Sequence, residues 1–347
     1  MSVSGIAVCC FRSKKNESIE LTIVGDIMLS RGVDSYIKKS GYDHLYENMK
    51  DIFLEDDLTI VNLECPITEY SRGANKASRF VFKASADNAK AMKKAGIDLC
   101  DLANNHTMDY RSEGLKDTMD ELARAGISYV GAGERAGEDM SYIFEKNGFR
   151  LGVLAYSIFP PEGFAYNADK ANINYLLDYD GNKSDKIKTE LENMKADFKI
   201  IYFHWGIEYE RFASKMQKKL ARYAIDNGAD FVVGAHPHVI QESEVYKDKY
   251  IYYSLGNCIF DKQIQRGTDE GLMLRISIDK NKDVNIVEQK FKINPFLSKL
   301  RKIKPIKPAS KSKSVVRKGF KKSSLIFKNS HKFLFSITIL CKHYNIK

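Results

Sequence analysis

Two histidines that lie two positions apart carry the strongest chemical signal in this chain. His236 and His238 follow an apolar run at residues 230–233, which predicts a buried strand, and Pro237 lies between them. Proline fixes the backbone φ angle, so the turn stays open and both imidazole rings can face one point. Neutral imidazole is the commonest metal-ligating side chain, so this pair is a candidate metal site. The alternative is that both are ordinary histidines of a surface loop.

Other strand-like runs also end in side chains that can bind a metal or move a proton. These residues are Asp26, Glu64, Asn105 with His106, and His204. In open α/β sheets, ligands gather outside the carboxyl ends of the strands, so we expect these residues to meet His236 and His238. Each has an ordinary structural explanation, but their joint placement favours one shared site. Carboxylate, amide and imidazole ligands together suit one or two divalent ions of manganese, iron or zinc, and a two-metal cluster generates hydroxide and holds a phosphate-like or carbonyl-like centre.

Strand-like and helix-like segments alternate along the chain up to about residue 235 and would position these residues. Strands are predicted at residues 20–24, 57–62, 80–82, 97–102, 127–130, 149–156, 198–203, 230–233, 239–246, 250–254, 272–278 and 284–291. Helices are predicted at residues 33–39, 87–95, 112–124, 183–194 and 215–227, and Ser112 is the expected N-cap of the third. The alternation predicts an α/β fold with a largely parallel sheet, followed by an antiparallel portion.

The charge is divided unevenly between the body of the chain and its C-terminal end. Residues 291–347 hold 16 Lys and Arg and no acid, whereas the rest holds 39 basic and 45 acidic residues. A basic segment without a folded recognition motif binds any polyanion, so we predict no specific nucleic-acid partner. We expect residues 297–322 to be largely disordered. Residues 324–339 resemble an amphipathic helix for an anionic membrane surface, and the alternatives are docking on the body or holding an acidic polymer.

Cysteine usage and hydropathy bear on the compartment. The six cysteines include no C-x-x-C pair, which argues against a zinc ribbon and suits a reducing compartment. Residues 1–11 have no charged n-region and only a short apolar run, so no signal peptide is evident. No stretch reaches the roughly 18 apolar residues of a membrane-spanning helix. We therefore expect a cytoplasmic or peripherally membrane-associated protein.

Six motifs, found in order, together resemble the capsule-synthesis protein CapA family. They are GDIMLSRG (25–32), NLECPIT (62–68), LANNHTMDY (102–110), HWGIEY (204–209), GAHPHVIQ (234–241) and YSLGNCIFD (253–261). This bacterial family is associated with poly-γ-glutamate capsule and is similar in fold to calcineurin-like metallophosphoesterases, which form a four-layer αββα sandwich. The resemblance implies an N-terminal extension at residues 1–18, a domain of this fold at residues 19–294 and a basic, partly disordered tail at residues 295–347.

The resemblance also implies which residues hold metal. The implied ligands are Asp26, Glu64 as the bridging carboxylate, Asn105, His204, His236 and His238. Such folds usually have a metal-binding histidine two residues after the first aspartate. This chain has Met28 at that position, which weakens the first metal position. His106 resembles the histidine that protonates the leaving group, and Asp109 is placed to orient it. Glu208 is a candidate to support a metal ligand or to act as a base.

Four further motif residues are candidate substrate contacts. Arg31, Arg79 and Lys83 suit an anionic substrate, and Asn257 is placed to line the pocket, although each also fits an ordinary solvated side chain. The leading hypothesis is a metal-dependent hydrolase or transferase that acts on an anionic polymer or its precursor in capsule biosynthesis. The alternative, which Met28 favours, is a non-catalytic component of a polymer-synthesis or export complex.

Overall fold

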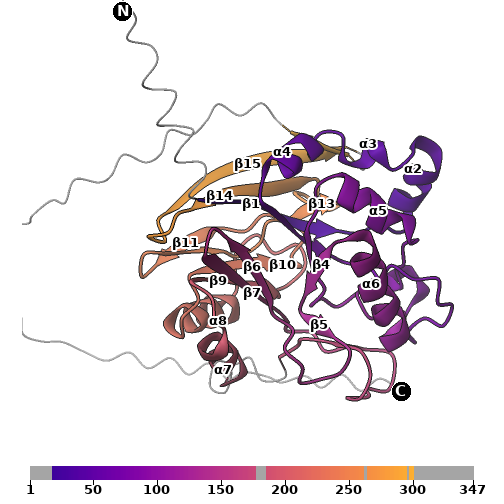
Figure 1. Ribbon diagram of the computed structural model, residues 1–347. Coiled ribbons are helices and arrows are strands. Elements are labelled where there is room, and N and C mark those ends of the chain that lie inside the picture. Colours follow the sequence, from indigo (N-terminus) through magenta and orange to yellow (C-terminus); the bar gives the residue numbers. More distant parts are fainter. Residues whose placement is uncertain (1–17, 177–184, 262–263, 295–296, 301–347) are drawn as a thin grey trace, which may run out of the picture. The chain divides into compact units, whose positions relative to one another are not determined.

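Two mixed β-sheets that face each other form the centre of the fold (Figure 1). The computed structural model describes residues 18–176, 185–261, 264–294 and 297–300. The first sheet consists of β1 (Ile19–Ile27), β2 (Leu58–Leu63), β3 (Leu99–Asp101), β4 (Ser128–Val130), β13 (Asn257–Ile259), β14 (Glu270–Ile278), β15 (Val284–Asn294) and β16 (Leu297–Leu300). The second consists of β6 (Tyr142–Lys146), β7 (Phe149–Ser157), β9 (Phe198–His204), β10 (Phe231–Ala235), β11 (Ser243–Tyr246) and β12 (Lys249–Tyr252). A short pair joins β5 (Ala132–Gly133) to β8 (Asn172–Ile173).

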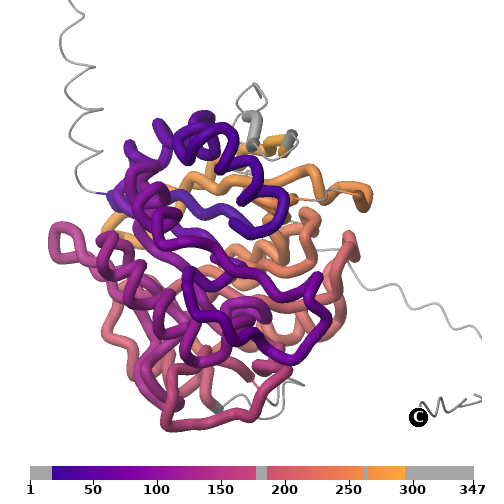
Figure 2. The backbone as a smooth tube through the Cα atoms, turned by 90° about the vertical axis from the view of Figure 1, so that its right-hand side faces the viewer, coloured from indigo at the N-terminus to yellow at the C-terminus, as the bar shows by residue number. Residues whose placement is uncertain are grey.

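Each sheet has a parallel centre and an antiparallel border. The first sheet follows the order β16-β15-β14-β1-β2-β3-β4, where β1 to β4 are parallel and β14 to β16 antiparallel. In the second, β11-β12-β10-β9-β7-β6, the four central strands are parallel and both edges antiparallel. Figure 2 shows the orange C-terminal strands beside the indigo N-terminal segment, as the β1–β14 pairing requires. The structure therefore has two mixed sheets where the sequence predicted one parallel block and one antiparallel block.

The side chains of β9 show why the fold is layered. Ile200 and Tyr202 point into an apolar core that also contains Leu21 and Ile60 of the first sheet. The alternate residues Ile201 and Phe203 belong to a different core on the outer face. Strict alternation with both faces apolar is what a strand buried between two layers requires.

Helices cover the two outer faces, which completes four layers and confirms the αββα architecture (Figure 1). The helices against the first sheet are α2 (Gly32–Ser40), α3 (Asp43–Tyr46), α4 (Lys50–Glu55), α5 (Asp87–Lys94) and α6 (Arg111–Ala125). Those against the second are α7 (Asp185–Asn193) and α8 (Lys215–Asp226). Helix α8 begins with a capping box, in which Ser214 accepts from the backbone of Gln217 and the Gln217 side chain accepts from the backbone of Ser214.

Three local predictions are wrong. The predicted strand at residues 80–82 begins as a 3₁₀ turn, Ser78–Phe80. Helix α6 starts at Arg111 and has no side-chain cap, whereas the sequence suggested a serine N-cap. Leu297–Leu300 was expected to be disordered but pairs with β15 as β16, because the backbone of that edge strand offers hydrogen bonds whatever the side chains are.

All residues that the structure describes belong to one compact unit. The predicted amphipathic helix at residues 324–339 and the rest of the basic tail from residue 301 lie outside the described residues. Within the described ranges, no helix combines the length and the apolar character that a membrane crossing requires.

Candidate functional site

The carboxyl ends of parallel strands from both sheets meet at one edge of the sandwich. Asp26 is the next-to-last residue of β1, and Glu64 follows β2 directly. From the other sheet, His204 ends β9 and His236 follows β10, and these two strands are paired in register there. The site therefore joins residues that are up to 212 positions apart in the sequence, from Asp26 to His238.

Four of the predicted ligands form a group that we call the histidine-rich set: Glu64, Asn105, His204 and His236. The Nε2 atom of His204 lies 3.2 Å from Oε1 of Glu64, 2.9 Å from Oδ1 of Asn105 and 3.1 Å from Nδ1 of His236. Asn105 and Glu64 come from the first sheet and the histidines from the second. A single point between the sheets thus faces a carboxylate, an amide oxygen and two imidazoles, which is a donor set that transition-metal ions accept.

A second group, the carboxylate-rich set, consists of Asp26, Glu64 and His238. The Nδ1 atom of His238 lies 3.1 Å from Oδ2 of Asp26 and 3.9 Å from Oε2 of Glu64. Asn257 stands behind this set, because its Oδ1 lies 3.0 Å from the same Nδ1 atom. The two sets share Glu64, which presents one oxygen to each.

Glu64 gives the strongest indication that the pocket suits a cation. Its side chain is fully buried, and neither carboxylate oxygen accepts a hydrogen bond from a described residue. An unsatisfied buried carboxylate is costly, so such groups are normally paired or bound to metal. Potential ligand atoms of Glu64 with His204 and His236, and of Glu64 with Asp26 and His238, lie within 4.8 Å of one another. The residues present are therefore consistent with divalent metal binding.

The electrostatics of the side chains differ between the two sets. Burial, together with the neighbouring Asp26, raises the pKa of Glu64 well above its usual range. Burial and adjacent imidazoles lower the pKa of His204 and of His236 well below the usual value, so both rings are neutral. Burial opposes protonation of His238 too, but the carboxylates of Glu64 and Asp26 raise its pKa to about 9. Without an ion, a proton on His238 compensates the buried negative charge.

The backbone of the histidine turn is strained in a way that aims both rings. His236 and His238 have φ angles of 93° and 57°, a region that residues other than glycine rarely adopt. The amide of His236 donates to Oδ2 of Asp26 at 3.3 Å, and the carbonyl of Pro237 accepts from Tyr209 at 2.8 Å. Strain of this kind persists only where surrounding contacts fix it, and it clusters at functional sites.

His106 lies next to these sets with its partner Asp109. The Nδ1 atom of His106 is 3.0 Å from Oδ2 of Asp109, and the ring packs on Phe82 at 4.3 Å between centroids. Burial lowers the pKa of His106, although the hydrogen bond to Asp109 opposes this shift. The contact that the sequence predicted between His106 and Asp109 is present, while the proton-donor role of His106 stays a prediction.

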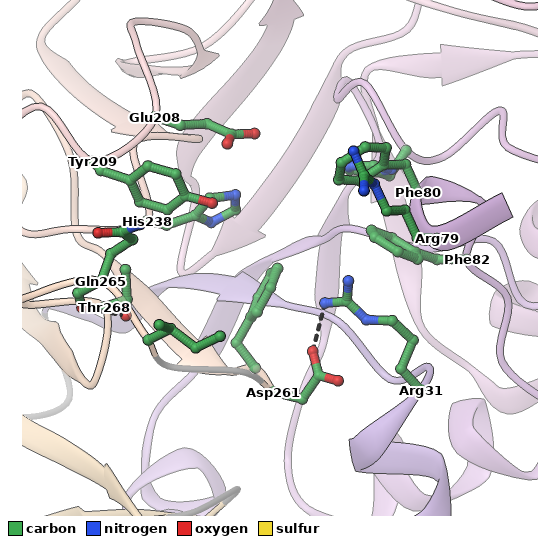
Figure 3. Close-up of a pocket in the computed structure, with 13 residues that line it drawn as sticks. Arg31, Arg79, Phe80, Phe82, Glu208, Tyr209, His238, Asp261, Gln265 and Thr268 are labelled. Atoms are coloured by element: carbon green, nitrogen blue, oxygen red, sulfur yellow. Dashed lines mark hydrogen bonds and ion pairs between the residues drawn. The ribbon is translucent and has the colours of Figure 1, made fainter. Parts of the chain in front are cut away.

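A pocket of about 570 Å³ opens over the site (Figure 3). Its lining residues are Arg31, Arg79, Phe80, Phe82, His106, Glu208, Tyr209, His238, Phe260, Asp261, Ile264, Gln265 and Thr268. Figure 3 shows Glu208, Tyr209 and His238 on one wall and Arg79, Phe80 and Phe82 on the facing wall. Glu208 also lies within metal-binding reach of His236 and His238, although its own side chain is exposed.

The predicted substrate contacts have different environments. Arg31 is paired with Asp261 and lies over Phe82, with 4.3 Å from its Cζ to the ring centroid. Arg79 is exposed on Phe80, and no carboxylate of the described residues forms an ion pair with it.

Two of the predicted contacts do not line the pocket. Lys83 donates to the carbonyl of Tyr70 at 3.2 Å, and Asn257 is buried behind His238. Asn257 is therefore a support for His238 in this structure, and Lys83 is tied to a neighbouring loop.

Two asparagines were missed by the sequence analysis. The side-chain amide of Asn62 donates to Oδ1 of Asp26 at 2.7 Å and approaches Nδ1 of His204 at 3.3 Å, so it joins the two sheets. Asn104 donates to Oδ1 of Asn62 at 3.0 Å and accepts from the amide of His106 at 3.0 Å. The signal was available, because Asn62 lies two residues before Glu64 and thus faces the same side of its strand.

Met28 occupies a different environment from the ligands. It is fully buried in the apolar core between the first sheet and its helices, and its sulfur accepts from the amide of Ser30 at 3.2 Å. The carboxylate-rich set therefore gains no donor from this position.

Comparison with solved structures gives a match to "GAP50 the anchor in the inner membrane complex of Plasmodium". The match has a TM-score of 0.41 and 12% identity, and it covers 84% of this chain and 90% of that one. A similarity of this size leaves the function of the chain open.

Comparison with known sequences is more informative. The chain is 33% identical over 271 residues to "Capsule biosynthesis protein CapA" of Bacillus anthracis, covering 77% of this chain and 66% of that protein. It is 30% identical over 321 residues to "PGA biosynthesis protein CapA" of Bacillus subtilis, covering 91% of this chain and 82% of that protein. Residues 20–262 match the family described as bacterial capsule synthesis protein PGA_cap. The chain therefore belongs to this capsule synthesis family, as its six motifs predicted.

Proposed function

We propose that this protein is a metal-dependent hydrolase or transferase that acts on an anionic polymer, or on its precursor, in the production of a capsule of the poly-γ-glutamate type. The observation that carries the proposal is the sharing of Glu64 between two buried ligand sets, one of which contains the pocket-lining residue His238. The capsule part follows from family membership, whereas the reaction is our inference from the side chains.

The ligand sets have a defined chemical task in this proposal. Glu64, Asn105, His204 and His236 would hold one ion, and Asp26, Glu64 and His238 a second. A bound divalent ion polarises an ester, amide or phosphoryl oxygen and makes a water molecule more acidic. Phe159 packs on the His236 ring at 4.3 Å between centroids and shields this side of the set from solvent.

In this proposal, residues of the pocket walls would contact the substrate. Arg79 supplies a positive charge that no described carboxylate neutralises, so it is the better contact for an anionic group. The charge of Arg31 is already compensated by Asp261, which suits this guanidinium to hold the wall in place. His106 reaches the pocket with the ring nitrogen that Asp109 does not occupy, and that nitrogen gives a proton to the leaving atom.

The test is metal content followed by turnover. Full-length protein is purified without chelator, its metals are measured by inductively coupled plasma mass spectrometry, and hydrolysis of bis(p-nitrophenyl) phosphate and shortening of poly-γ-glutamate are followed. We expect at least one equivalent of manganese, iron or zinc and turnover on one of these substrates. His106→Asn should keep the metal and lose about 10²–10⁴-fold in rate, the range of general acid catalysis. His44→Asn is the matched control, because His44 is exposed and pairs only with Glu47 among the described residues.

A second candidate function is supported by Met28. Because its side chain lies in an apolar core, the carboxylate-rich set is short of a donor, which suits a scaffold that retains one ion without turnover. Retained metal with no hydrolysis of either substrate, and no effect of His106→Asn, would favour a non-catalytic component of a polymer-synthesis or export complex.

A further inference from the structure

Lys76 makes a buried ion pair that the proposed chemistry has not yet used. Its Nζ atom lies 2.5 Å from Oδ1 of Asp109, and the two side chains are 13% and 0% exposed. The same ammonium lies 3.5 Å from the carbonyl oxygen of Asn105 and 3.6 Å from Oε1 of Glu162. Surface lysines rarely give up this much hydration, so the pair with Asp109 is the contact that fixes this side chain.

The Asp109 carboxylate is held from three directions. Its Oδ2 atom accepts from the amide of Phe82 at 2.8 Å and faces Nδ1 of His106 at 3.0 Å, while Lys76 takes Oδ1. Among the described residues no other donor reaches Oδ1. If the Lys76 ammonium were removed, this buried oxygen would lose its counter-charge, and the carboxylate could turn away from His106.

The orientation of His106 depends on that carboxylate. Its Nδ1 atom is engaged by Asp109, so the other ring nitrogen, Nε2, is the one left for exchange in the pocket. The ring also packs on Phe82, whose backbone is anchored to the same Asp109 oxygen. Asp109 therefore fixes both the orientation of the His106 ring and the position of Phe82, on which that ring packs.

We propose that Lys76 is a positioning residue for His106, acting through Asp109. The inference rests on the proposed hydrolase function. In that reaction water forms a bond to the central atom, and the bond to the leaving oxygen breaks with its electron pair on that oxygen. For this step the His106 ring carries a proton on both nitrogens, and the leaving oxygen takes the one on Nε2 while Nδ1–H stays on Asp109. A proton of the attacking water passes to solvent, and Nε2 regains a proton from solvent. Lys76 touches neither substrate nor metal ligand side chain in this scheme, but it keeps Nε2 aimed at the leaving oxygen.

The loop around Lys76 is anchored by its backbone, so the side chain can be changed without unfolding the loop. The amide of Ala74 donates to the carbonyl of Asp109 at 2.7 Å, and the amide of Asn75 donates to the carbonyl of Gly163 at 2.6 Å. Lys76→Met retains length and apolar stem and removes only the charge.

The dependence on the leaving group tests this role. A proton donor matters most when the leaving group is a poor one, so we compare diphenyl phosphate with bis(p-nitrophenyl) phosphate, whose leaving phenol is more acidic. Lys76→Met should lower the rate of diphenyl phosphate hydrolysis about tenfold or more. It should change the rate of bis(p-nitrophenyl) phosphate hydrolysis less than about threefold. Neither effect should exceed the 10²–10⁴-fold span of general acid catalysis. Lys76→Arg should restore most of the loss, because it keeps the positive charge.

Lys146→Met is the matched control. Lys146 pairs with Asp57 at 2.6 Å and is 26% exposed, but it bonds to the start of the first strand, at the carbonyl of Ser18. Its loss should leave the ratio of the two rates unchanged. Equal slowing of both esters by Lys76→Met, or no slowing of either, would overturn the positioning role.

A spectroscopic measurement separates this inference from the proposed function. In full-length protein labelled with ¹⁵N-histidine, the His106 ring is identified by its absence in His106→Asn. We expect a fixed Nδ1–H form in the wild type and in Lys76→Arg, and an averaged or altered ring signal in Lys76→Met. If the wild type hydrolyses neither ester, the hydrolase proposal fails, while the ring signal still decides whether Lys76 positions His106. An unchanged signal in Lys76→Met would contradict it.

Discussion

The two ligand sets of this protein share one carboxylate but are built differently. In the histidine-rich set, three donors lie within 3.2 Å of one imidazole nitrogen, and both histidines are neutral. In the carboxylate-rich set, two buried acids face a single histidine that they keep protonated, and Met28 adds no donor. The first set is therefore ready to accept an ion, whereas the second must release a proton first. From this difference we expect one strong and one weak metal position within a single site.

The largest effect is expected from Glu64, because both sets need it. Glu64→Gln keeps the shape of the side chain but removes the negative charge that each set shares, so bound metal should fall below about a tenth of the wild-type content. Inductively coupled plasma mass spectrometry after gel filtration measures this. Glu47→Gln is the control, since Glu47 is exposed, pairs with His44 and belongs to neither set, and it should leave the metal content unchanged. Wild-type metal content in Glu64→Gln would show that the two sets are not joined in this way.

A comparison of His236→Ala with His238→Ala tests which set is stronger. His236→Ala should remove the tightly held ion and with it the stabilisation that the ion gives, about 2.7 kcal/mol when free metal is a hundredfold above its dissociation constant. His238→Ala should lose only the weaker ion and keep most of the metal-dependent rise in Tm. The measurement is differential scanning calorimetry with and without added metal. The reverse ranking would contradict the comparison.

The pH dependence of the metal-free protein should differ in sign between the sets. Unfolded histidines titrate near pH 6.5. The pKa of His204 and of His236 is lowered in the folded state, so the unfolded chain binds more protons below 6.5 and the free energy of unfolding falls as pH drops. The pKa of His238 is raised to about 9, so its contribution is lost as pH rises through 9.

Calorimetry of the metal-free protein, in chelator, measures Tm between pH 5 and pH 9.5 and tests both the loss of stability at acid pH, the acid limb, and the loss at alkaline pH, the alkaline limb. We expect the highest Tm near neutral pH, with a decline on both sides. In His236→Ala the acid limb should flatten while the alkaline limb remains, and His238→Ala should do the opposite. Two limbs that respond equally to both substitutions would show that the sets do not titrate separately.

The smallest effect is expected at Met28. Met28→His should not raise the number of bound metal ions, because the side chain lies in the apolar core and not in the pocket. Burying an imidazole there should lower the free energy of unfolding by about 1–3 kcal/mol, and the volume-conserving Met28→Leu should cost less than about 1.5 kcal/mol. Metal content and urea unfolding measure both. A gain of one metal equivalent in Met28→His would mean that the position can reach the carboxylate-rich set.

Much of the site could be predicted because parallel strands place chemistry at their carboxyl ends. Asp26, Glu64 and His204 each follow an apolar run, and that pattern was enough to predict that they meet. The four-layer architecture was predicted from the family resemblance, whereas the alternation of strands and helices alone predicted one largely parallel sheet and an antiparallel portion.

The rest depended on contacts between distant parts of the chain. The role of Lys76 arises from a partner across a loop, and this residue does not stand out locally in the sequence. Asn62 has a local signal in its spacing from Glu64, but its contact with His204 lies in the other sheet. Lys83 looked like a substrate contact by its charge, but the carbonyl of Tyr70 takes its ammonium group. The local sequence pattern does not show which positively charged side chain already has a hydrogen-bond partner.

The arrangement of the ligands across two sheets has a consequence for the way the chain comes apart. Glu64 and Asn105 come from the first sheet, while His204 and His236 come from the second. A bound ion would therefore act as a reversible cross-link between the two halves of the sequence, much as a disulfide ties distant segments together. Such a link raises the free energy of the openings that separate the sheets, and it leaves local fraying at the outer helices unaffected. Metal should then protect the amides of β1, β9 and β10 from hydrogen exchange far more than those of α2 or α8.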